Sequence, residues 1–390
     1  MDSQVYAVKC PDYSQAAEKT AELLNMIGGI GAFVSTGEKI ALKVNLLLAA
    51  RPEQAVTTHP AIVSSVAVAA KGQGAAPFIV DSPGSGYRYE KSILMKTYRT
   101  TGMEDAAREA GIELNLDCSH REVSFPNGKL IKRFEVISPV ADANGVINLC
   151  KLKTHMFTYM TGAVKNHFGV IPGLAKPGYH AKLRDTGRFA AMLLDLTELV
   201  SARLFIMDAV VAMEGDGPHA GDPRHVGLIL ASTNPVALDA VGGEIIGLAR
   251  EDNPVLMEAE RRGLGPNRLE DVELIGLDKQ ALRVPNFKTP ASYYGGMGMG
   301  RIPLHLRLLS PLFKNGMSVK PQVQKKKCIA CGVCAEACPM QAITVIENKN
   351  AQIDDNACIR CYCCHEMCPE KAIELKQSML YRMIKPAGTA

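Results

Sequence analysis

One cysteine pattern occurs twice near the end of this chain, and it restricts the fold and the chemistry more than any other feature. The copies are CIACGVCAEACPMQAI, which begins at Cys328, and CIRCYCCHEMCPEKAI, which begins at Cys358. Each has the spacing C-x2-C-x2-C-x3-C-P, in which three thiolates surround one iron-sulfur cubane and the fourth crosses to the other cluster. A zinc site needs two separated cysteine pairs, which neither copy provides. The repeat therefore predicts two 4Fe-4S clusters.

The crossing of the fourth cysteine divides the ligands into two sets. The predicted sets are Cys328, Cys331, Cys334 and Cys368 for one cluster and Cys358, Cys361, Cys364 and Cys338 for the other. With both motifs complete, residues 323–377 resemble the bacterial-type ferredoxin with two 4Fe-4S clusters. Cys363 lies beside a predicted ligand. We expect it to be a small packing residue, and a spare ligand or a redox thiol are the alternatives.

The rest of the chain is long enough to form a sizeable core. The length of 390 residues favours two or three domains of about 150 residues each. The first residues, MDSQVYAVKCPDYSQ, lack the basic flank and apolar core of a signal peptide, and no apolar run reaches the roughly 18 residues of a membrane span. We therefore expect a cytoplasmic protein whose twelve cysteines are metal ligands or reduced thiols.

Upstream of about residue 287, short apolar runs alternate with helical stretches, which is typical of a layered α/β domain. Continuous apolar runs predict strands buried on both faces at 39–45, 77–81, 145–149, 203–208 and 226–232. Helix signals are Thr58 with Pro60, Asn234 with Pro235, and the closing Gly111. The predicted fold is a mostly parallel sheet with helices on both faces, followed by a small α+β unit of the ferredoxin type.

In such a sheet, ligands bind beyond the carboxyl ends of the strands. Three predicted strands end at Asn45, Asp81 and Asp208, and a fourth runs into the segment 151–180. We expect these ends to converge on one polar site. We predict that Asn45 and Asp81 belong to a cofactor-binding set and that Asp208 is catalytic.

The segment 151–180 holds four lysines and three histidines but no acidic residue. Lys151, Lys153 and His155 alternate, so in an extended strand they share one face, and they predict an anion or metal site. Farther along, Lys165 and Asn166 lie close to glycines that let a ligand approach the backbone. A solvated basic loop that pairs with acids elsewhere is the alternative.

The turn DSPGSG at 81–86 is a second candidate for anion binding. Backbone amides there, with the hydroxyls of Ser82 and Ser85 and the flexible Gly84, suit a phosphate or carboxylate. The turn lacks the lysine and threonine of a P-loop and the three-glycine spacing of a dinucleotide site, so we predict neither ATP nor NAD. A plain turn is the alternative.

The loop MEGDGPHAG adds Glu214, Asp216 and His219 after a buried strand. With His155 and His180 these residues predict either a carboxylate and imidazole metal site or a general acid and base pair. In the alternative, the two carboxylates cap the loop by accepting backbone N–H bonds.

Several motifs in the large domain together resemble the family classed as domain of unknown function 362, whose members are often fused to a ferredoxin unit. The motifs are LKVNLL, TTHP, VDSPG, VINLCKLKTH, TGAVKNHFGVIPG, MDAVVAMEGDGP and ASTNPVALDA, and they span about residues 42–240. The resemblance implies an iron-sulfur protein. It also implies that the family's motif residues are Lys151, Lys153, His155, Lys165, Asn166, Asp208, Glu214, Gly217 and Asp239.

The predicted organisation is an α/β domain at 1–287, a basic connector rich in methionine and proline at 288–322, the ferredoxin-like domain at 323–377 and a tail at 378–390. We expect the connector to pack across the large domain, because its prolines interrupt any long helix. Contact with a membrane surface through its apolar and basic residues is the alternative, and we do not expect it.

These features predict an anaerobic iron-sulfur protein that relays single electrons between an external redox protein and a site in the α/β domain. Lys151, Lys153 and Lys165 would neutralise a small anionic substrate or cofactor, and His155 or Glu214 would supply a proton. Such a protein would be an oxidoreductase. The alternatives are a non-catalytic electron carrier that docks a partner enzyme and a metal-cofactor assembly protein with an additional metal. We predict no nucleic-acid partner.

Overall fold

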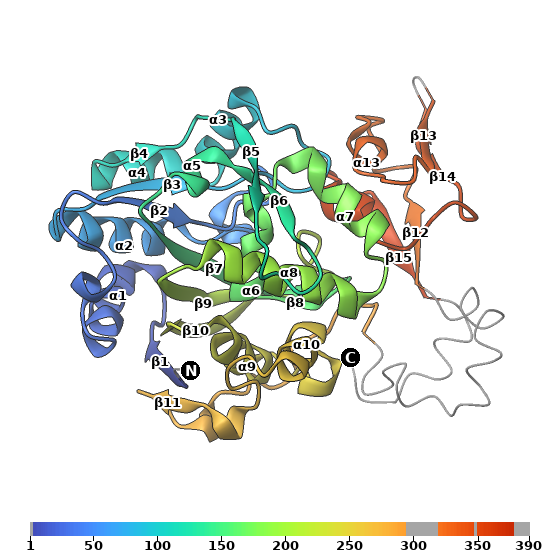
Figure 1. Cartoon of the computed structure of the whole chain (residues 1–390). Coiled ribbons are helices and arrows are strands. Elements are labelled where there is room, and N and C mark those ends of the chain that lie inside the picture. The colour runs from blue at the N-terminus through green and yellow to red at the C-terminus, as the bar shows by residue number, and fades with distance from the viewer. Residues whose placement is uncertain (1–2, 294–318, 347–348, 378–390) are drawn as a thin grey trace.

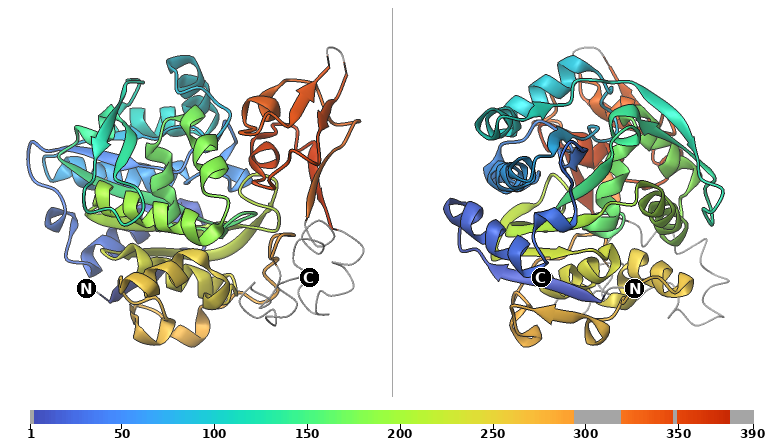
Figure 2. Two further views of the ribbon diagram at one scale, coloured as in Figure 1. Left: turned by 45° about the vertical axis from the view of Figure 1, so that its right-hand side comes forward. Right: turned by 60° about the vertical axis from the view of Figure 1, so that its left-hand side comes forward.

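The computed structural model describes residues 3–293, 319–346 and 349–377. These residues form a large α/β domain built on one sheet and a small cysteine-bearing module beside it (Figure 1). Two further views show the module against one end of the large domain (Figure 2). The predicted fold class, a mostly parallel α/β sheet followed by a small α+β unit, is confirmed.

The large sheet contains nine strands within the described residues. They are β1 (Gln4–Lys9), β2 (Lys39–Lys43), β3 (Ala76–Val80), β4 (Glu113–Leu114), β7 (Gly145–His155), β8 (Tyr159–Thr161), β9 (Leu204–Glu214), β10 (Asp222–Ser232) and β11 (Glu273–Ile275). Their order is β11-β1-β10-β9-β7-β2-β3-β4, with β8 paired to β7. Neighbours from β9 to β4 are parallel, so the carboxyl ends of β9, β7, β2 and β3 meet at one edge. Against these strands β10 runs antiparallel.

Helices cover both faces of this sheet (Figure 1). Those on one face are α1 (Ala16–Met26), α2 (Pro60–Gly72), α3 (Lys91–Thr100) and α4 (Met103–Ala110). Those on the other face include α6 (Ala163–Asn166), α8 (Thr186–Val200), α9 (Pro235–Ile245) and α10 (Pro254–Arg262). The remaining short helices are α5 (Ser138–Ala141) and α7 (Lys176–Lys182), and a separate hairpin consists of β5 (His120–Ser124) and β6 (Arg133–Ile137). The two apolar cores therefore lie on opposite faces of one sheet.

The helix starts follow from local capping. In α9, Asn234 accepts the backbone N–H groups of Val236 and Ala237, as its sequence signal predicts. In α2 the cap is His59, whose Nδ1 accepts the Ala61 N–H at 3.2 Å. The hydroxyl of Thr58, which we expected to open this helix, instead donates to the Leu149 carbonyl at 2.7 Å. Thr58 therefore joins α2 to the sheet.

Two strands are longer than their apolar runs. β7 continues from 149 to His155, and β9 continues from 208 to Glu214. Ile147 and Leu149 of β7 face the core that contains α1 and α2, and alternation along the strand puts Lys151, Lys153 and His155 on the same side. All three polar side chains are buried. The strand thus carries polar groups into the interior at its carboxyl end.

The module consists of two small antiparallel pairs and two short helices. Its elements are β12 (Lys320–Val323), α13 (Val333–Glu336), β13 (Ile343–Val345), β14 (Ala351–Ile353), α14 (Cys363–Met367) and β15 (Ile373–Lys376). β12 pairs with β15, so the module begins at Lys320, inside the segment that we assigned to the connector. Most of that connector, 294–318, lies outside the described residues, as does the tail 378–390.

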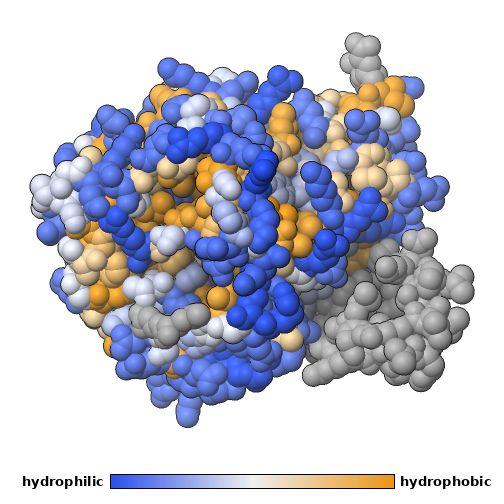
Figure 3. Space-filling view, viewed as in Figure 1, coloured by the Kyte–Doolittle hydropathy of each residue, from blue (hydrophilic) through white to orange (hydrophobic). Residues whose placement is uncertain are grey.

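Tight apolar packing joins the module to the large domain. Met367 and Cys363 of α14, both fully buried, share a cluster with Leu48, Val56 and Met213. Burial of one such side chain contributes about 1.5–3 kcal/mol. The face of the large domain seen in Figure 3 is mostly hydrophilic, with apolar residues exposed toward its middle. No helix within 3–293, 319–346 and 349–377 is long and apolar enough to cross a membrane.

Candidate functional site

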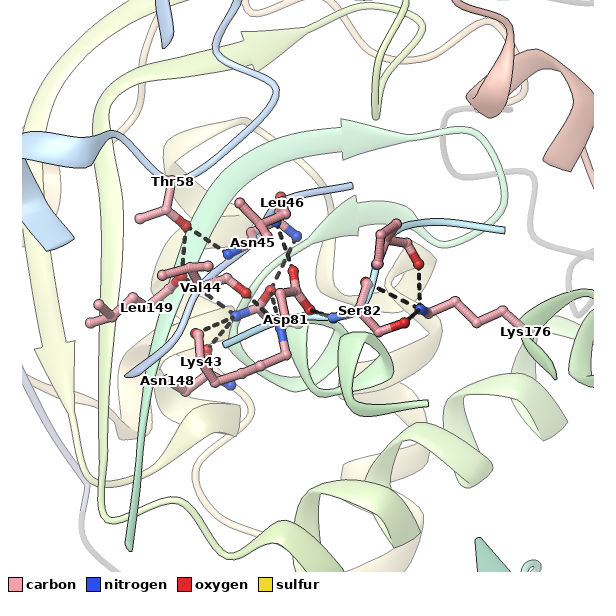
Figure 4. Close-up of polar contacts among 12 residues, drawn as sticks. Lys43, Val44, Asn45, Leu46, Thr58, Asp81, Ser82, Asn148, Leu149 and Lys176 are labelled. Carbon is pink, nitrogen blue, oxygen red and sulfur yellow. Dashed lines mark hydrogen bonds and ion pairs between the residues drawn. The ribbon is translucent and has the colours of Figure 1, made fainter. Parts of the chain in front are cut away.

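A buried ion pair lies at the carboxyl ends of β2 and β3. Lys43 Nζ is 2.8 Å from Asp81 Oδ1, and both side chains are almost fully buried. Asp81 also accepts the backbone N–H groups of Leu46 at 2.7 Å and Ser82 at 2.9 Å. Figure 4 shows Asp81 at the centre of these contacts. The carboxylate therefore fixes the turns that follow two neighbouring strands.

Amide side chains extend this network to β7 and α6. Asn166 donates to Asn148 Oδ1 at 2.8 Å and accepts from Asn45 Nδ2 at 3.1 Å. Asn45 in turn accepts from Lys153 Nζ at 2.7 Å, and the same ammonium donates to the Val56 carbonyl at 2.6 Å. Lys153 thus has two neutral partners and, among the residues that the structure describes, no carboxylate within ion-pair distance. Burial lowers the pKa of Lys153 well below its ordinary value, and Lys165 lowers it further.

Lys151, by contrast, is neutralised. Its ammonium lies 2.8 Å from Asp208 Oδ2 and 2.9 Å from the hydroxyl of Tyr13. Asp208 also accepts the Tyr13 hydroxyl and the His59 backbone N–H, each at 2.9 Å. The imidazole of His59 stacks on Tyr13 with a centroid distance of 3.5 Å. This closed group compensates the charge of Lys151, so Lys151 is less available to an anion than a lysine without a carboxylate partner.

The DSPGSG turn packs against the module. A Cβ on Gly84 would lie 2.7 Å from Met367 Cε, and one on Gly86 would lie 2.7 Å from the Ala337 Cβ. The absence of side chains therefore allows a close approach of the module. Behind the turn, the buried Lys176 donates to the Ser82 hydroxyl at 3.0 Å and to the Ser82 carbonyl at 3.2 Å (Figure 4). Burial lowers the pKa of Lys176 to about 7.

His155, at the end of β7, meets a carboxylate from the module. Its Nδ1 accepts the backbone N–H groups of Phe157 at 3.0 Å and Thr158 at 3.3 Å. A neutral imidazole then carries its proton on Nε2, which lies 3.1 Å from Glu366 Oε1 without hydrogen-bond alignment. Burial lowers the pKa of His155 well below its ordinary value. Burial also raises the pKa of Glu366 to about 7, against the opposing charges of Lys165 and Lys153.

Lys165 on α6 is the free cation of this region. Among the described residues its ammonium has no hydrogen bond or ion pair, and it lies 5.8 Å from the ring centroid of Phe168. Burial lowers the pKa of Lys165, and Glu366 opposes that shift. Asp239 holds the start of α6 by accepting the Ala163 and Val164 N–H groups. Burial raises the pKa of Asp239 to about 7.

The remaining predicted residues have structural contacts of their own. Glu214 accepts the Lys288 backbone N–H at 3.1 Å, and Asp216 accepts that of Ala291 at 2.7 Å. Both carboxylates thereby hold the chain that leaves the large domain. His180 is enclosed by phenylalanine rings, and burial lowers its pKa to about 3. Within the described part of the chain, no three histidine, cysteine, aspartate or glutamate side chains form a single-ion site.

The module contains two cavities that are lined by cysteines. Cys328, Cys331, Cys334 and Cys368 line the first, and Cys338, Cys358, Cys361 and Cys364 line the second. These are the two sets that the repeat predicts. Four converging thiols around one enclosed space suit a 4Fe-4S cluster, which would supply one-electron chemistry when bound.

Comparison with protein families gives the same division of the chain. Residues 40–244 match the domain of unknown function DUF362. This chain belongs to the DUF362 family. Residues 327–372 match the 4Fe-4S dicluster domain. The protein is therefore a DUF362 protein with a ferredoxin-type iron-sulfur domain for electron transfer.

One curated protein and one solved structure are among the matches to this chain. Thylakoid-associated protein sll1697 from Synechocystis sp. is 34% identical over 275 residues, which cover 69% of this chain and 81% of that protein. The lactate racemase apoprotein from Thermoanaerobacterium thermosaccharolyticum has a TM-score of 0.42 and 10% identity. That match covers 64% of this chain and 58% of the racemase chain.

The sequence reasoning missed four residues of the DUF362 site region: Tyr13, Lys43, Lys176 and Glu366. Lys43 and Lys176 each stand alone among apolar residues and glycines, so their sequence surroundings suggest no partner. Glu366 has an equivalent in Glu336 of the first cysteine repeat, so the repeat itself does not distinguish it. The available signal is the larger residue on each side of Glu366, because His365 and Met367 replace Ala335 and Ala337.

Proposed function

We propose that this DUF362 protein is an iron-sulfur oxidoreductase of anaerobic metabolism. It passes single electrons between an external redox protein and a small anionic ligand bound in the α/β domain beside Lys165. The cysteine module supplies the one-electron chemistry, and the α/β domain supplies the binding site. Covalent fusion keeps both parts at a fixed separation.

The observation that carries this proposal is the contact of Glu366 with His155 in a region where Lys153 and Lys165 have no carboxylate within ion-pair distance among the described residues. Glu366 lies between the cluster ligands Cys364 and Cys368, yet its carboxylate is buried beside His155 of the large domain. Within the part of the chain that the structure describes, Lys165 has no pairing partner and Lys153 has only neutral partners. Two cations with one nearby carboxylate favour the uptake of one more anionic group. A site with this charge balance lies next to the ligand helix α14.

His155 gives the site a hydrogen-bond donor of fixed identity. Its Nδ1 is occupied by two backbone N–H groups, so the Nε2–H group of the neutral ring is available toward Glu366 and a ligand. The depressed pKa of His155 keeps the ring neutral near pH 7. The ring can therefore donate a hydrogen bond to an oxyanion without adding a charge. Lys153 and Lys165 supply the charge compensation.

Anion binding to the anaerobic, cluster-loaded protein tests the proposal. Oxalate and phosphate are the probes, and calorimetry is the measurement. We expect saturable binding that weakens about tenfold or more in Lys165→Met, since one unscreened charge contact is worth at least about 1.4 kcal/mol in a buried site. Lys182→Met is the matched control, because Lys182 is an exposed lysine on α7. Iron content must be equal in all three proteins.

Electron transfer to the ligand is tested separately. Nitrite, sulfite and fumarate serve as oxidants of the reduced protein, and stopped-flow absorbance follows the reoxidation. His155→Ala and Lys153→Met should slow reoxidation by the preferred oxidant while both clusters remain. Equal rates in these variants and the parent would contradict the assignment. A stoichiometric complex with a redox enzyme, without anion binding, would instead favour the electron carrier that docks a partner.

A further inference from the structure

The two cysteine-lined cavities differ in their exposure to solvent. The cavity lined by Cys328, Cys331, Cys334 and Cys368 is bordered by the loop from Ile329 to Gly332. In this loop Cys331 is exposed, and Ile329 is 62% exposed, more than any other large hydrophobic side chain among the described residues. We call this cavity the open cavity. Its cysteines border the outer surface of the module.

The second cavity, lined by Cys338, Cys358, Cys361 and Cys364, is covered by the large domain. Tyr362, which lines it, is buried against Met156 of the large domain. Cys361, another lining residue, packs against the cluster that contains Leu48 and Met213. We call this cavity the covered cavity. It lies on the side of the module that faces the proposed anion site.

Exposed lysines surround the open cavity. Lys325 and Lys326 precede the ligand loop, and both are exposed without an ion pair among the described residues. Lys349 is also exposed, and the side chain of the adjacent Asn350 donates to the carbonyls of Lys325 and Cys328. This contact holds the turn that carries Lys349 beside the ligand loop.

Among the described residues of this rim, the carboxylates are fewer than the lysines. Lys327 pairs with Glu374 at 3.3 Å, and the exposed Glu370 lines the cavity itself. Over 323–377 the chain has seven basic and seven acidic residues. The excess of lysine near the open cavity therefore comes from an uneven placement of charges within the module and not from a net positive charge. Ile346, 40% exposed, adds a second apolar side chain beside Val345, which lines the cavity. Apolar residues also reach the module surface among hydrophilic ones in Figure 3.

We propose that the face formed by Lys325, Lys326, Ile329, Ile346 and Lys349 docks an acidic one-electron carrier protein. Exposed apolar side chains give the centre of such a contact its affinity, and the lysines at the rim attract a partner of opposite charge. One electron passes from the carrier to the protein, or in the reverse direction, and no bond is made or broken. The cluster in the open cavity therefore exchanges electrons with the external carrier. The cluster in the covered cavity exchanges them with the α/β domain.

Electron exchange with a carrier of known charge tests this face. The acidic probe is a reduced plant-type 2Fe-2S ferredoxin, the basic probe is cytochrome c, and stopped-flow absorbance gives the second-order rate constants. The test variants are Ile329→Asp and the double variant Lys325→Glu/Lys326→Glu. The control variants are Val68→Asp, at a side chain 55% exposed on α2, and Lys91→Glu/Lys96→Glu, at two exposed lysines of α3.

We expect both test variants to slow exchange with the acidic ferredoxin about tenfold or more and both control variants to leave it unchanged. The rate for the parent protein should fall as salt is added. Reduction by dithionite, which needs no docking, should be equal in all five proteins and shows that each is folded and loaded.

Three results would overturn the proposal. The first is equal rates in the test and control variants, and the second is no exchange with the acidic ferredoxin in either direction. The third is a membrane role for the face, seen as co-sedimentation with vesicles of phosphatidylserine and phosphatidylcholine that the test variants abolish. A preference of the parent for cytochrome c, with rates that the lysine reversals raise, would show instead that the partner carries a positive charge.

Discussion

The two cysteine repeats have the same ligand spacing but opposite surroundings. Glu336 in α13 and Glu366 in α14 occupy equivalent positions thirty residues apart. Glu336 is exposed, whereas Glu366 is 5% exposed and lies beside His155. Met367 and the equivalent Ala337 are both fully buried in the junction with the large domain, where Met367 has the larger side chain. The glutamate of the first repeat therefore faces solvent, whereas the glutamate of the second is buried against the sheet domain.

This difference shows how a module built from two similar repeats can have different surroundings at its two clusters. Spacing fixes which thiols converge, and it is identical in the two copies. Burial and charge set the properties of each metal centre beyond its ligands. The covered cavity has buried cations and a carboxylate on its far side, whereas the open cavity has exposed lysines. A duplicated sequence can therefore exchange electrons with an external protein at one end and with a binding site at the other.

The largest expected effect comes from removing one cysteine ligand from either copy of the repeat. Cys331→Ala and Cys361→Ala each remove one ligand, so iron should fall from about eight to about four per chain in either variant. A strong chelator should remove iron from the parent in two phases of similar size, because one cavity is open. Cys361→Ala should retain the fast phase and Cys331→Ala the slow phase. A single phase in the parent would contradict the difference in access.

The second prediction concerns Asp239, which holds the start of α6. The folded-state pKa of Asp239, about 7, exceeds the ordinary value of 3.8. Its contribution to stability is therefore fully present below pH 3.8 and is lost as the pH rises through 7. That loss should be on the order of 4 kcal/mol for a fully buried group. Thermal unfolding between pH 4 and pH 7 should show a weaker pH dependence in Asp239→Asn than in the parent.

A control separates this effect from a general acid response. Asp185 caps α8 with the same kind of backbone contact but is exposed. Asp185→Asn should keep the pH dependence of the parent. If Asp239→Asn also keeps it, the burial of Asp239 does not control the stability of the α6 region.

The smallest expected effect is a change in cluster potential when either of the two equivalent glutamates is replaced. Glu366→Gln removes a negative charge beside the covered cavity, so the potential of one cluster should rise, on the order of tens of millivolts. Glu336→Gln removes an exposed charge that water and salt screen, and it should change either potential much less. Redox titration followed by electron paramagnetic resonance measures both clusters. Equal shifts in the two variants would show that the copies have similar surroundings.

The cysteine sets and the sheet could be predicted because their signals are local. Ligand spacing lies within two short segments, and apolar runs marked five of the longer strands. Asn234 and Gly111 marked helix ends for the same reason, since a cap needs contacts only a few residues away. Short edge strands such as β4 carried no such run and were missed.

The charge state of the site could not be predicted, because it depends on contacts between distant segments. Lys151 and Lys165 look alike in sequence, but the pairing of β7 with β9 places Asp208 beside Lys151 and leaves Lys165 free. The role of Glu366 depends on how the module docks, which no local pattern records. The DSPGSG turn was similarly ambiguous, because glycine allows close approach of a ligand or, as at Gly84, of another part of the chain.

The most direct test of the account is a redox titration of the cluster-loaded protein with and without oxalate, followed by electron paramagnetic resonance. An anion bound beside Lys165 should lower the potential of the cluster in the covered cavity, by tens of millivolts, and leave the other unchanged. Lys165→Met should abolish the shift. Unchanged potentials, or the same shift in Lys165→Met, would contradict an anion site coupled to one end of the module.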